Sequence, residues 1–238
     1  MRLGGSLAGF IALPPLALLL AVSLDVPLVN VWSALLRLPA LLPDFFATLA
    51  RVTLVALGAW LAAMAFARLL SLAPVAWSLT QPLVQFARHV SPFAWFPFAI
   101  IWFGLGEAPA VFVLFVALFF PALVAARTTL EGLPVVYIEE ARVSGATEWQ
   151  IALRVELPLL AGPLLGLLRV LWGLGWTAGI AVEMLGVRNG MGFRLLDFRY
   201  LQQHDNMIAT LLVMGFAGLL VDLLLRMLEE RFAATATQ

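Results

Sequence analysis

The sequence contains no cysteine and no lysine, and it has little charge of either sign. All 14 basic residues are arginines, and charged residues make up 12% of the 238 residues. Without cysteine there are no disulfide bonds and no thiol chemistry, so the sequence does not indicate whether the protein works in an oxidising or a reducing compartment. Without lysine there is no P-loop, because that motif needs a lysine to reach the β- and γ-phosphates of ATP. If ATP drives this protein, a partner must hydrolyse it.

The sequence also has few of the residues that other classes of enzyme require. The two histidines, His89 and His204, cannot build a typical zinc site without cysteine ligands. The chain has no Gly-x-Ser-x-Gly motif of a serine hydrolase. Glu183 and Asp222 are the candidate carboxylates for a membrane protease, but both are predicted near span ends, where solvated anchors are the commoner role. We therefore expect no catalytic residue, no metal site and no cofactor bound by this chain.

What is abundant is apolar sequence of helical length. The chain is 63% hydrophobic, with a mean hydropathy of +1.01, whereas a soluble domain is about half apolar and a quarter charged. The apolar runs are longer than the alternating segments of an outer-membrane barrel. These features predict an all-α, polytopic membrane protein.

A membrane-spanning helix needs about 20 apolar residues, and this length predicts about six spans. They are Leu7–Leu24, Phe45–Ala67, Pro92–Gly104, Pro109–Ala126, Leu159–Ile180 and Met207–Leu225. Residues 1–44 are expected to form an N-terminal transmembrane helix and an external loop, and residues 45–238 the remaining core. The segment from Leu72 to Val90 is open between a loop with a short helix and the start of the third span.

The arginines give the orientation, because cytoplasmic loops carry an excess of basic residues. An N-terminus inside places eight arginines in the cytoplasm, namely Arg2, Arg68, Arg88, Arg127, Arg142, Arg154, Arg226 and Arg231. Four remain outside, namely Arg37, Arg188, Arg194 and Arg199. Both termini are therefore predicted to be cytoplasmic. Arg51 and Arg169 fall within spans, and Arg51 is near enough to a span end to snorkel.

One charged segment, EEARVSGATEWQIALRVELP, interrupts the apolar sequence between the fourth and fifth spans. Pro134 suits the first turn of a short helix, and Gly145 can end that helix in a left-handed conformation. Thr147 to Gln150 has the pattern of a capping box that starts a second helix. We interpret the segment as a cytoplasmic helix–turn–helix; an ordinary solvated loop is an equal alternative from these residues alone.

This segment resembles the EAA loop of permeases from binding-protein-dependent ABC importers. The resemblance rests on Glu139, Ala141, Gly145, Val155, Leu157 and Pro158, whose fixed spacing is conserved in that loop. Glu140 and Val155 stand where the family pattern has alanine and isoleucine. Ser91–Pro121, Leu167–Phe193 and Thr48–Val52 are similar to the nitrate/sulfonate/taurine/bicarbonate group, so the resemblance runs from Thr48 to the C-terminus.

The resemblance implies a type I ABC importer (MetI-like) permease fold and a location in the bacterial cytoplasmic membrane. It implies two ATPase subunits that hold ATP and Mg, an external solute-binding protein, and a second copy of this chain. The remaining partner is membrane lipid, and nothing indicates nucleic acid. The coupling loop of residues 134–158 would contact the ATPase through Glu139, Glu140, Ala141, Arg142, Gly145, Ala146, Leu157 and Pro158. The solute would be a small anion or an organic sulfonate.

Two other functions remain open: a gradient-driven secondary carrier and a non-transporting membrane scaffold. A carrier usually shows inverted repeats, and we find none in the sequence. No 20–50-residue repeat is visible either.

The fifth span carries a stripe of small and polar residues at helical spacing. It comprises Gly162, Gly166, Arg169, Gly173, Trp176, Thr177 and Ile180. One interpretation is a helix-packing seam, which the pairs Gly162/Gly166 and Gly175/Gly179 favour. The other is the wall of a translocation pathway that includes Arg169, Gly173, Trp176 and Thr177, with Glu183 at its outer end. An arginine at this depth needs a partner or water, and it would suit an anionic solute.

Overall fold

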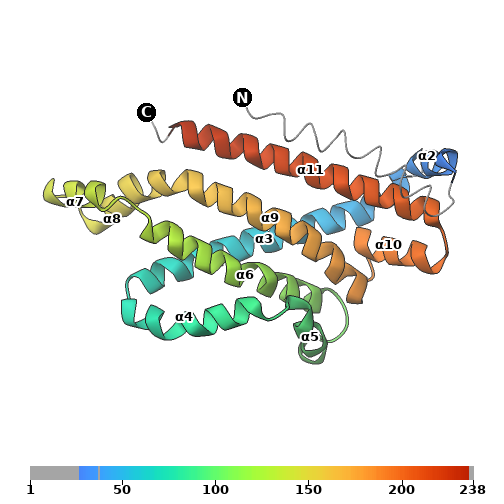
Figure 1. Ribbon diagram of the computed structural model, residues 1–238, viewed down its shortest axis with the longest axis horizontal. Helices are drawn as coiled ribbons and strands as arrows, with labels where there is room; N and C mark the ends of the chain where they lie inside the picture. The colour runs from blue at the N-terminus through green and yellow to red at the C-terminus, as the bar shows by residue number, and fades with distance from the viewer. Residues whose placement is uncertain (1–26, 37, 236–238) are drawn as a thin grey trace.

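The computed structural model describes residues 27–36 and 38–235, and within these ranges every regular element is a helix (Figure 1). The long helices are α3 (Leu42–Ser71), α6 (Glu107–Glu131), α9 (Leu157–Gly186) and α11 (His204–Thr235). The shorter ones are α2 (Leu28–Leu36), η1 (Leu38–Leu41), α4 (Pro74–His89), η2 (Pro92–Trp95), α5 (Phe96–Phe103), α7 (Val135–Val143), α8 (Glu148–Ile151), η3 (Ala152–Glu156) and α10 (Met191–Tyr200). The predicted first span, Leu7–Leu24, lies outside the described residues.

Among the described residues, four segments are long and apolar enough to cross a membrane. They are Leu42–Ser71, Glu107–Glu131, Trp149–Gly186 and His204–Arg231. These four correspond to the predicted second, fourth, fifth and sixth spans. The all-α, polytopic prediction is confirmed.

The core lies where α3, α6 and α9 pack against one another. Small residues allow this packing: Ala56, Ala59 and Ala63 on α3 have no exposed surface. Leu114 and Leu118 of α6 fill the space between them and α9. Because lipid is as apolar as these side chains, close packing of small residues is the main attraction between membrane helices.

The predicted third span, Pro92–Gly104, is wrong as a span, because η2 and α5 together are too short to cross a membrane. Instead, the chain returns along the bundle through three shorter helices, α4, η2 and α5. Figure 1 shows α4 starting beside the end of α3 and running along α6 toward α5. The open segment Leu72–Val90 is thus mostly helix. Its direction carries Arg88 away from the end where α3 terminates, so the placement of Arg88 with Arg68 on one side was wrong.

The two ends of the bundle differ. Figure 1 shows α7 and α8 at one end, with the end of α11 pointing the same way. At the other end lie α2, α5 and α10. We call these the hairpin end and the outer end. At the outer end, the external loop predicted within residues 1–44 contains helix α2, and the connection after α9 contains helix α10.

Candidate functional site

The charged segment folds as the sequence predicts, into two helices joined by a tight turn. Gly145 has φ +84° and ends α7. The turn is closed by two backbone hydrogen bonds: Ala146 N–H donates to Ala141 O (3.1 Å), and Gly145 N–H donates to Arg142 O (3.0 Å). This is the Schellman pattern, which satisfies carbonyls at a helix end. The interpretation of Gly145 as the turn residue is confirmed.

The capping box that starts the second helix is also present. Thr147 N–H donates to Gln150 Oε1 (2.9 Å), and Gln150 N–H donates to Thr147 Oγ1 (3.3 Å). Pro134 is one residue earlier than expected, because it caps α7 rather than standing in its first turn. We call residues 134–151, which form α7, the turn and α8, the hairpin.

The second helix does not stop before the fifth span. From α8 the chain passes through η3, a π-helical segment, directly into α9, so Trp149–Gly186 is one helix of 38 residues. Pro158 lies within its continuation instead of separating two helices. Proline has no N–H to donate to the carbonyl four residues earlier. Bonds to the fifth residue back, such as Leu157 N–H to Ala152 O, accommodate that missing donor.

The hairpin exposes most of its side chains. Of the predicted coupling residues, Glu139, Glu140, Arg142, Gly145, Leu157 and Pro158 are exposed, and Ala141 and Ala146 are half-buried. Large apolar side chains are exposed beside them, including Val136, Val143 and Trp149. Val143 is 90% exposed. These apolar side chains therefore contribute little to folding of the chain by itself.

At the base of the hairpin, an ion pair joins η3 to the end of α3. Arg68 Nη2 lies 3.0 Å from Glu156 Oε2. Both residues line an otherwise apolar cavity of about 160 Å³ between α3, α6 and the start of α9. Arg68 thereby ties η3, the segment that follows the hairpin, to α3.

Three of the five predicted pathway residues lie along a groove between α9 and α11, and Arg169 and Glu183 are not part of its lining. Gly173, Trp176 and Thr177 line it, together with Ile180 of the same stripe. Its volume is 640 Å³, and α11 contributes Met214, Gly215, Gly218 and Asp222 among others. A Cβ at Gly173 would meet nothing within 4 Å, so this glycine faces open space.

Arg169 has a partner, as an arginine at membrane depth requires. Its Nε and Nη2 donate to the two carboxylate oxygens of Asp222 at 2.7 and 2.8 Å. Its Nη1 donates to Glu229 at 3.4 Å. Asp222 is thus an ion-pair partner that links α9 to α11, and the expectation of a merely solvated anchor there was wrong. With two carboxylates and one guanidinium, the trio is net negative.

The small-residue seam occupies a different face of α9. A Cβ at Gly175 would lie 3.1 Å from Leu118 Cδ1, and one at Gly179 would lie 2.7 Å from Val52 Cγ2. The packing-seam interpretation is therefore supported at Gly175 and Gly179, and the pathway interpretation stays a prediction. Gly175 and Gly179 let α3 and α6 approach, whereas Gly173 and Thr177 face the groove.

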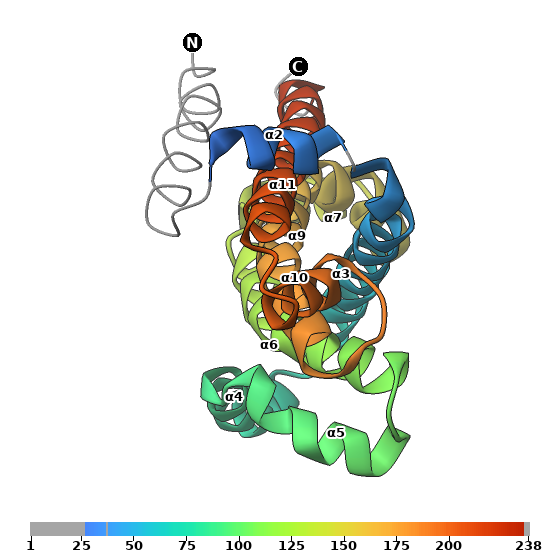
Figure 2. The same cartoon turned by 90° about the vertical axis from the view of Figure 1, so that its right-hand side faces the viewer.

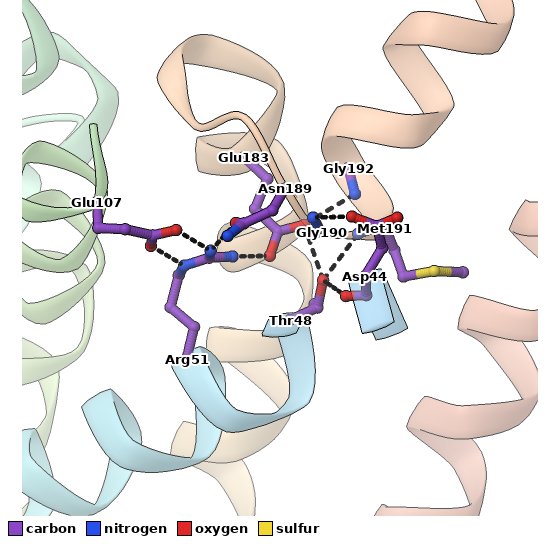
Figure 3. Close-up of polar contacts among 9 residues, drawn as sticks. All are labelled: Asp44, Thr48, Arg51, Glu107, Glu183, Asn189, Gly190, Met191 and Gly192. Atoms are coloured by element: carbon purple, nitrogen blue, oxygen red, sulfur yellow. Dashed lines mark hydrogen bonds and ion pairs between the residues drawn. The ribbon is translucent and has the colours of Figure 1, made fainter. Parts of the chain in front are cut away.

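A polar cluster at the outer end joins α3, α6, α9 and the loop before α10 (Figure 3). Arg51 is its centre. Its Nε and Nη2 donate to Glu107 at 2.8 Å each, and its Nη2 also donates to Asn189 Oδ1 at 2.6 Å. Its Nη1 pairs with Glu183. The predicted snorkelling of Arg51 to water was wrong, because only 6% of its side chain is exposed.

The other half of the cluster holds the loop between α9 and α10. Glu183 accepts hydrogen bonds from Thr48 Oγ1 (2.9 Å) and Gly192 N–H (2.8 Å). Gly190 N–H and Arg194 Nε donate to Asp44 at 2.9 and 2.6 Å. Gly190 has φ +106°, and a Cβ there would lie 2.6 Å from the Glu183 carboxylate. The loop can approach this closely because the residue is glycine.

Glu183 is therefore no solvated anchor, and the groove does not include it. Its side chain has no exposed surface, and its partners fix the outer ends of α3 and α9. The prediction missed this cluster. The available signal was that Arg51 and Glu183 both stand at the outer ends of apolar spans, where opposite charges are expected to pair.

Most of the chain matches a known protein family. Residues 55–234 match the family described as binding-protein-dependent transport system inner membrane component. The match covers α6, the hairpin, α9 and α11. The chain belongs to this family. It is an ABC transporter permease subunit, as the EAA-like loop indicated, and a transport component rather than an enzyme.

Several permeases are similar in sequence. One is an ABC transporter permease protein of Methanocaldococcus jannaschii, 35% identical over 156 residues, covering 65% of this chain and 58% of that protein. Another is the taurine transport system permease protein TauC of Escherichia coli, 29% identical over 185 residues, covering 78% of this chain and 67% of that one. The nitrate import permease protein NrtB of Leptolyngbya laminosa is 28% identical over 185 residues, covering 78% and 66%.

A similar fold occurs among solved structures of permeases. A chain of the inward-facing MetNI methionine ABC transporter superposes with a TM-score of 0.65 at 18% sequence identity. The superposition covers 81% of this chain and 94% of that chain. The predicted type I (MetI-like) permease fold is thereby confirmed.

Proposed function

We propose that this permease forms half of the membrane channel of an ATP-driven importer, and that the hairpin is its contact with the ATPase. The observation that carries this proposal is the exposed apolar surface of the hairpin. Val136, Val143 and Trp149 are exposed at the end of the bundle. The two valines lie between the span-length helices Glu107–Glu131 and Trp149–Gly186, and Trp149 is the first residue of the second one. Exposed apolar side chains outside a membrane are typical of a protein interface.

If ATP drives transport, a partner must hydrolyse it, because a sequence without lysine has no P-loop. We propose that two ATPase subunits hold ATP and Mg and that each receives one hairpin. An identical second copy would face the groove between α9 and α11 and enclose a pathway, since one copy leaves the groove open. A solute-binding protein would deliver the solute at the outer end. This arrangement places the hairpin and both termini in the cytoplasm of a bacterium.

The mechanical path begins at the hairpin. Glu139, Glu140, Ala141 and Arg142 on α7, with the Gly145–Ala146 turn, would enter a depression on the ATPase surface. Leu157 and Pro158 would join the contact to α9. When the two ATPase subunits close on ATP, the hairpins would move together. The bundle would then rock between inward-facing and outward-facing arrangements as rigid bodies.

The first test is a charge placed on the most exposed apolar residue of the hairpin. Val143→Asp should leave the fold unchanged, because Val143 is 90% exposed, but should abolish co-purification with the ATPase subunits of the same genome and ATP-dependent uptake. Leu105→Asp is the matched control. Leu105 is 78% exposed and lies between α5 and α6, away from the hairpin, so its variant should retain the ATPase.

If Val143→Asp retains the ATPase and full uptake, the hairpin is not the coupling contact. If both variants lose the ATPase, the loss has another cause than the hairpin surface. Uptake into proteoliposomes should be measured with taurine, nitrate and bicarbonate as probes. We propose a small anion or an organic sulfonate as the solute, because the taurine and nitrate permeases named above are among the chain's relatives.

A further inference from the structure

Helix α2 lies crosswise to the membrane-spanning helices. Figure 2 looks along the bundle from the outer end and shows α2 lying across the side of α11. The contact is made by Val31 of α2 with Ile208 and Leu212 of α11. A helix perpendicular to the spans runs parallel to the membrane plane. It cannot itself be a span, because its nine residues are too few.

The contact sets the depth of α2. The span-length helix His204–Arg231 begins at His204, so Ile208 and Leu212 follow four and eight residues after its first residue. At 1.5 Å per residue, these positions are about 6 and 12 Å from the outer end of that helix. Interfacial helices lie at a similar level, about 5–10 Å into the boundary between headgroups and acyl chains.

Three faces of α2 can be distinguished from burial. Val31 and Ala34 are buried against the bundle. On the opposite face, Val29, Trp32 and Leu36 are 76%, 66% and 68% exposed. At 100° per residue these three fall within about 60° of one another. The segment Leu28–Leu36 contains no charged residue.

The third face is polar and lies between the other two. Asn30 and Ser33 are centred about 100° from the exposed apolar row and about 100° from the buried residues. If the buried face points sideways into α11, the apolar row points sideways away from the bundle, and the polar residues point along the membrane normal. This is the order of surroundings at an interface: protein on one side, lipid on the other, and water above.

We infer that α2 is an interfacial helix whose row Val29, Trp32 and Leu36 binds the headgroup and acyl boundary of the outer leaflet. Tryptophan is enriched at this boundary, because its apolar ring carries one polar N–H. The helix would fix the outer end of α11 at one depth in the membrane. The lipid contact does not depend on the ATPase or on the solute, and only the assignment to the outer leaflet rests on the orientation proposed above.

The absence of cysteine makes the test clean, because a single introduced cysteine carries the only label. Val29→Cys and Leu36→Cys, each bearing a nitroxide, report on the apolar row. Asn30→Cys is the matched control on the polar face. Each labelled full chain should be reconstituted in lipid nanodiscs. Collision of each label with oxygen, which partitions into lipid, is then compared with collision with a water-soluble nickel chelate.

We expect a several-fold higher oxygen-to-nickel collision ratio at Val29 and Leu36 than at Asn30. Equal ratios at the three sites, with high nickel collision, would place α2 in water and overturn the inference. Low collision with both reagents at Val29 and Leu36 would show that protein covers the row, which also overturns it. The labels replace exposed side chains, so loss of folding is not expected to obscure the result.

Discussion

Replacing Arg51 by methionine tests whether the polar cluster holds the outer end together. Methionine keeps much of the apolar stem of arginine and removes its charge. The change deprives Glu183 of its cation, while Thr48 Oγ1 and Gly192 N–H continue to donate to it. Glu183 has no exposed side-chain surface, so water cannot replace the guanidinium.

The expected cost follows from that burial. Removing one partner of a buried ion pair typically destabilises a protein by about 3–5 kcal/mol, because an uncompensated buried charge remains. Glu107 offers the contrast on the same arginine, since half of its side chain is exposed. Glu107→Gln should cost about 1 kcal/mol or less, as exposed pairs do.

The free energy of unfolding should be measured by titrating the purified chain in mild detergent with sodium dodecyl sulfate and following tryptophan fluorescence. The double variant Arg51→Met with Glu183→Leu removes both buried charges. It should be more stable than Arg51→Met alone, since replacing both partners by apolar groups often restores stability. An Arg51→Met variant within about 1 kcal/mol of the parent would refute the reasoning. So would a double variant that is no more stable than Arg51→Met alone.

Two further predictions concern α9. Gly179→Ala should destabilise the chain by about 1–3 kcal/mol through overpacking against Val52. Gly173→Ala should be tolerated, because Gly173 faces open space. The same detergent titration measures both variants, and equal losses of stability would contradict the assignment of the two faces of α9. Arg169→Gln should lower the free energy of unfolding, because it leaves Asp222 on α11 without its two charge-assisted hydrogen bonds. Adding Asp222→Asn to that variant should recover part of the loss. Strictly additive losses in that double variant would argue against a direct pair.

Sequence reasoning succeeded where the determining residues are neighbours in the chain. Gly145, Thr147 and Gln150 lie within six residues, and each forms the local hydrogen bonds that its type predicts. The polar cluster could not be derived in this way. Arg51 and Glu183 are 132 positions apart, and hydropathy alone does not state which helix ends meet.

The wrong third span has a different cause. Pro92–Gly104 is strongly apolar, but hydropathy does not distinguish a short helix from part of a span. The return across the bundle begins in α4, which carries Gln81, Gln85 and Arg88 and so has the polarity of a loop. The placement of Arg88 on the hairpin side depended on that loop. The corrected path comes from packing of α4 against α6 and α3, which no local pattern encodes.

The uninterrupted helix from Trp149 to Gly186 has a mechanical consequence. At 1.5 Å per residue it is a rod about 57 Å long, whose lower tip is the hairpin and whose upper tip is held by Glu183. Its one widened stretch, Ala152 to Glu156, has looser hydrogen bonding than an ordinary helix. A push on the lower tip, as proposed for the ATPase contact, would bend this stretch first and would then tilt the rest of the helix about its upper tip. The groove residues Gly173 and Thr177 lie partway along that shaft, so a small swing below shifts them without any stretching of the chain.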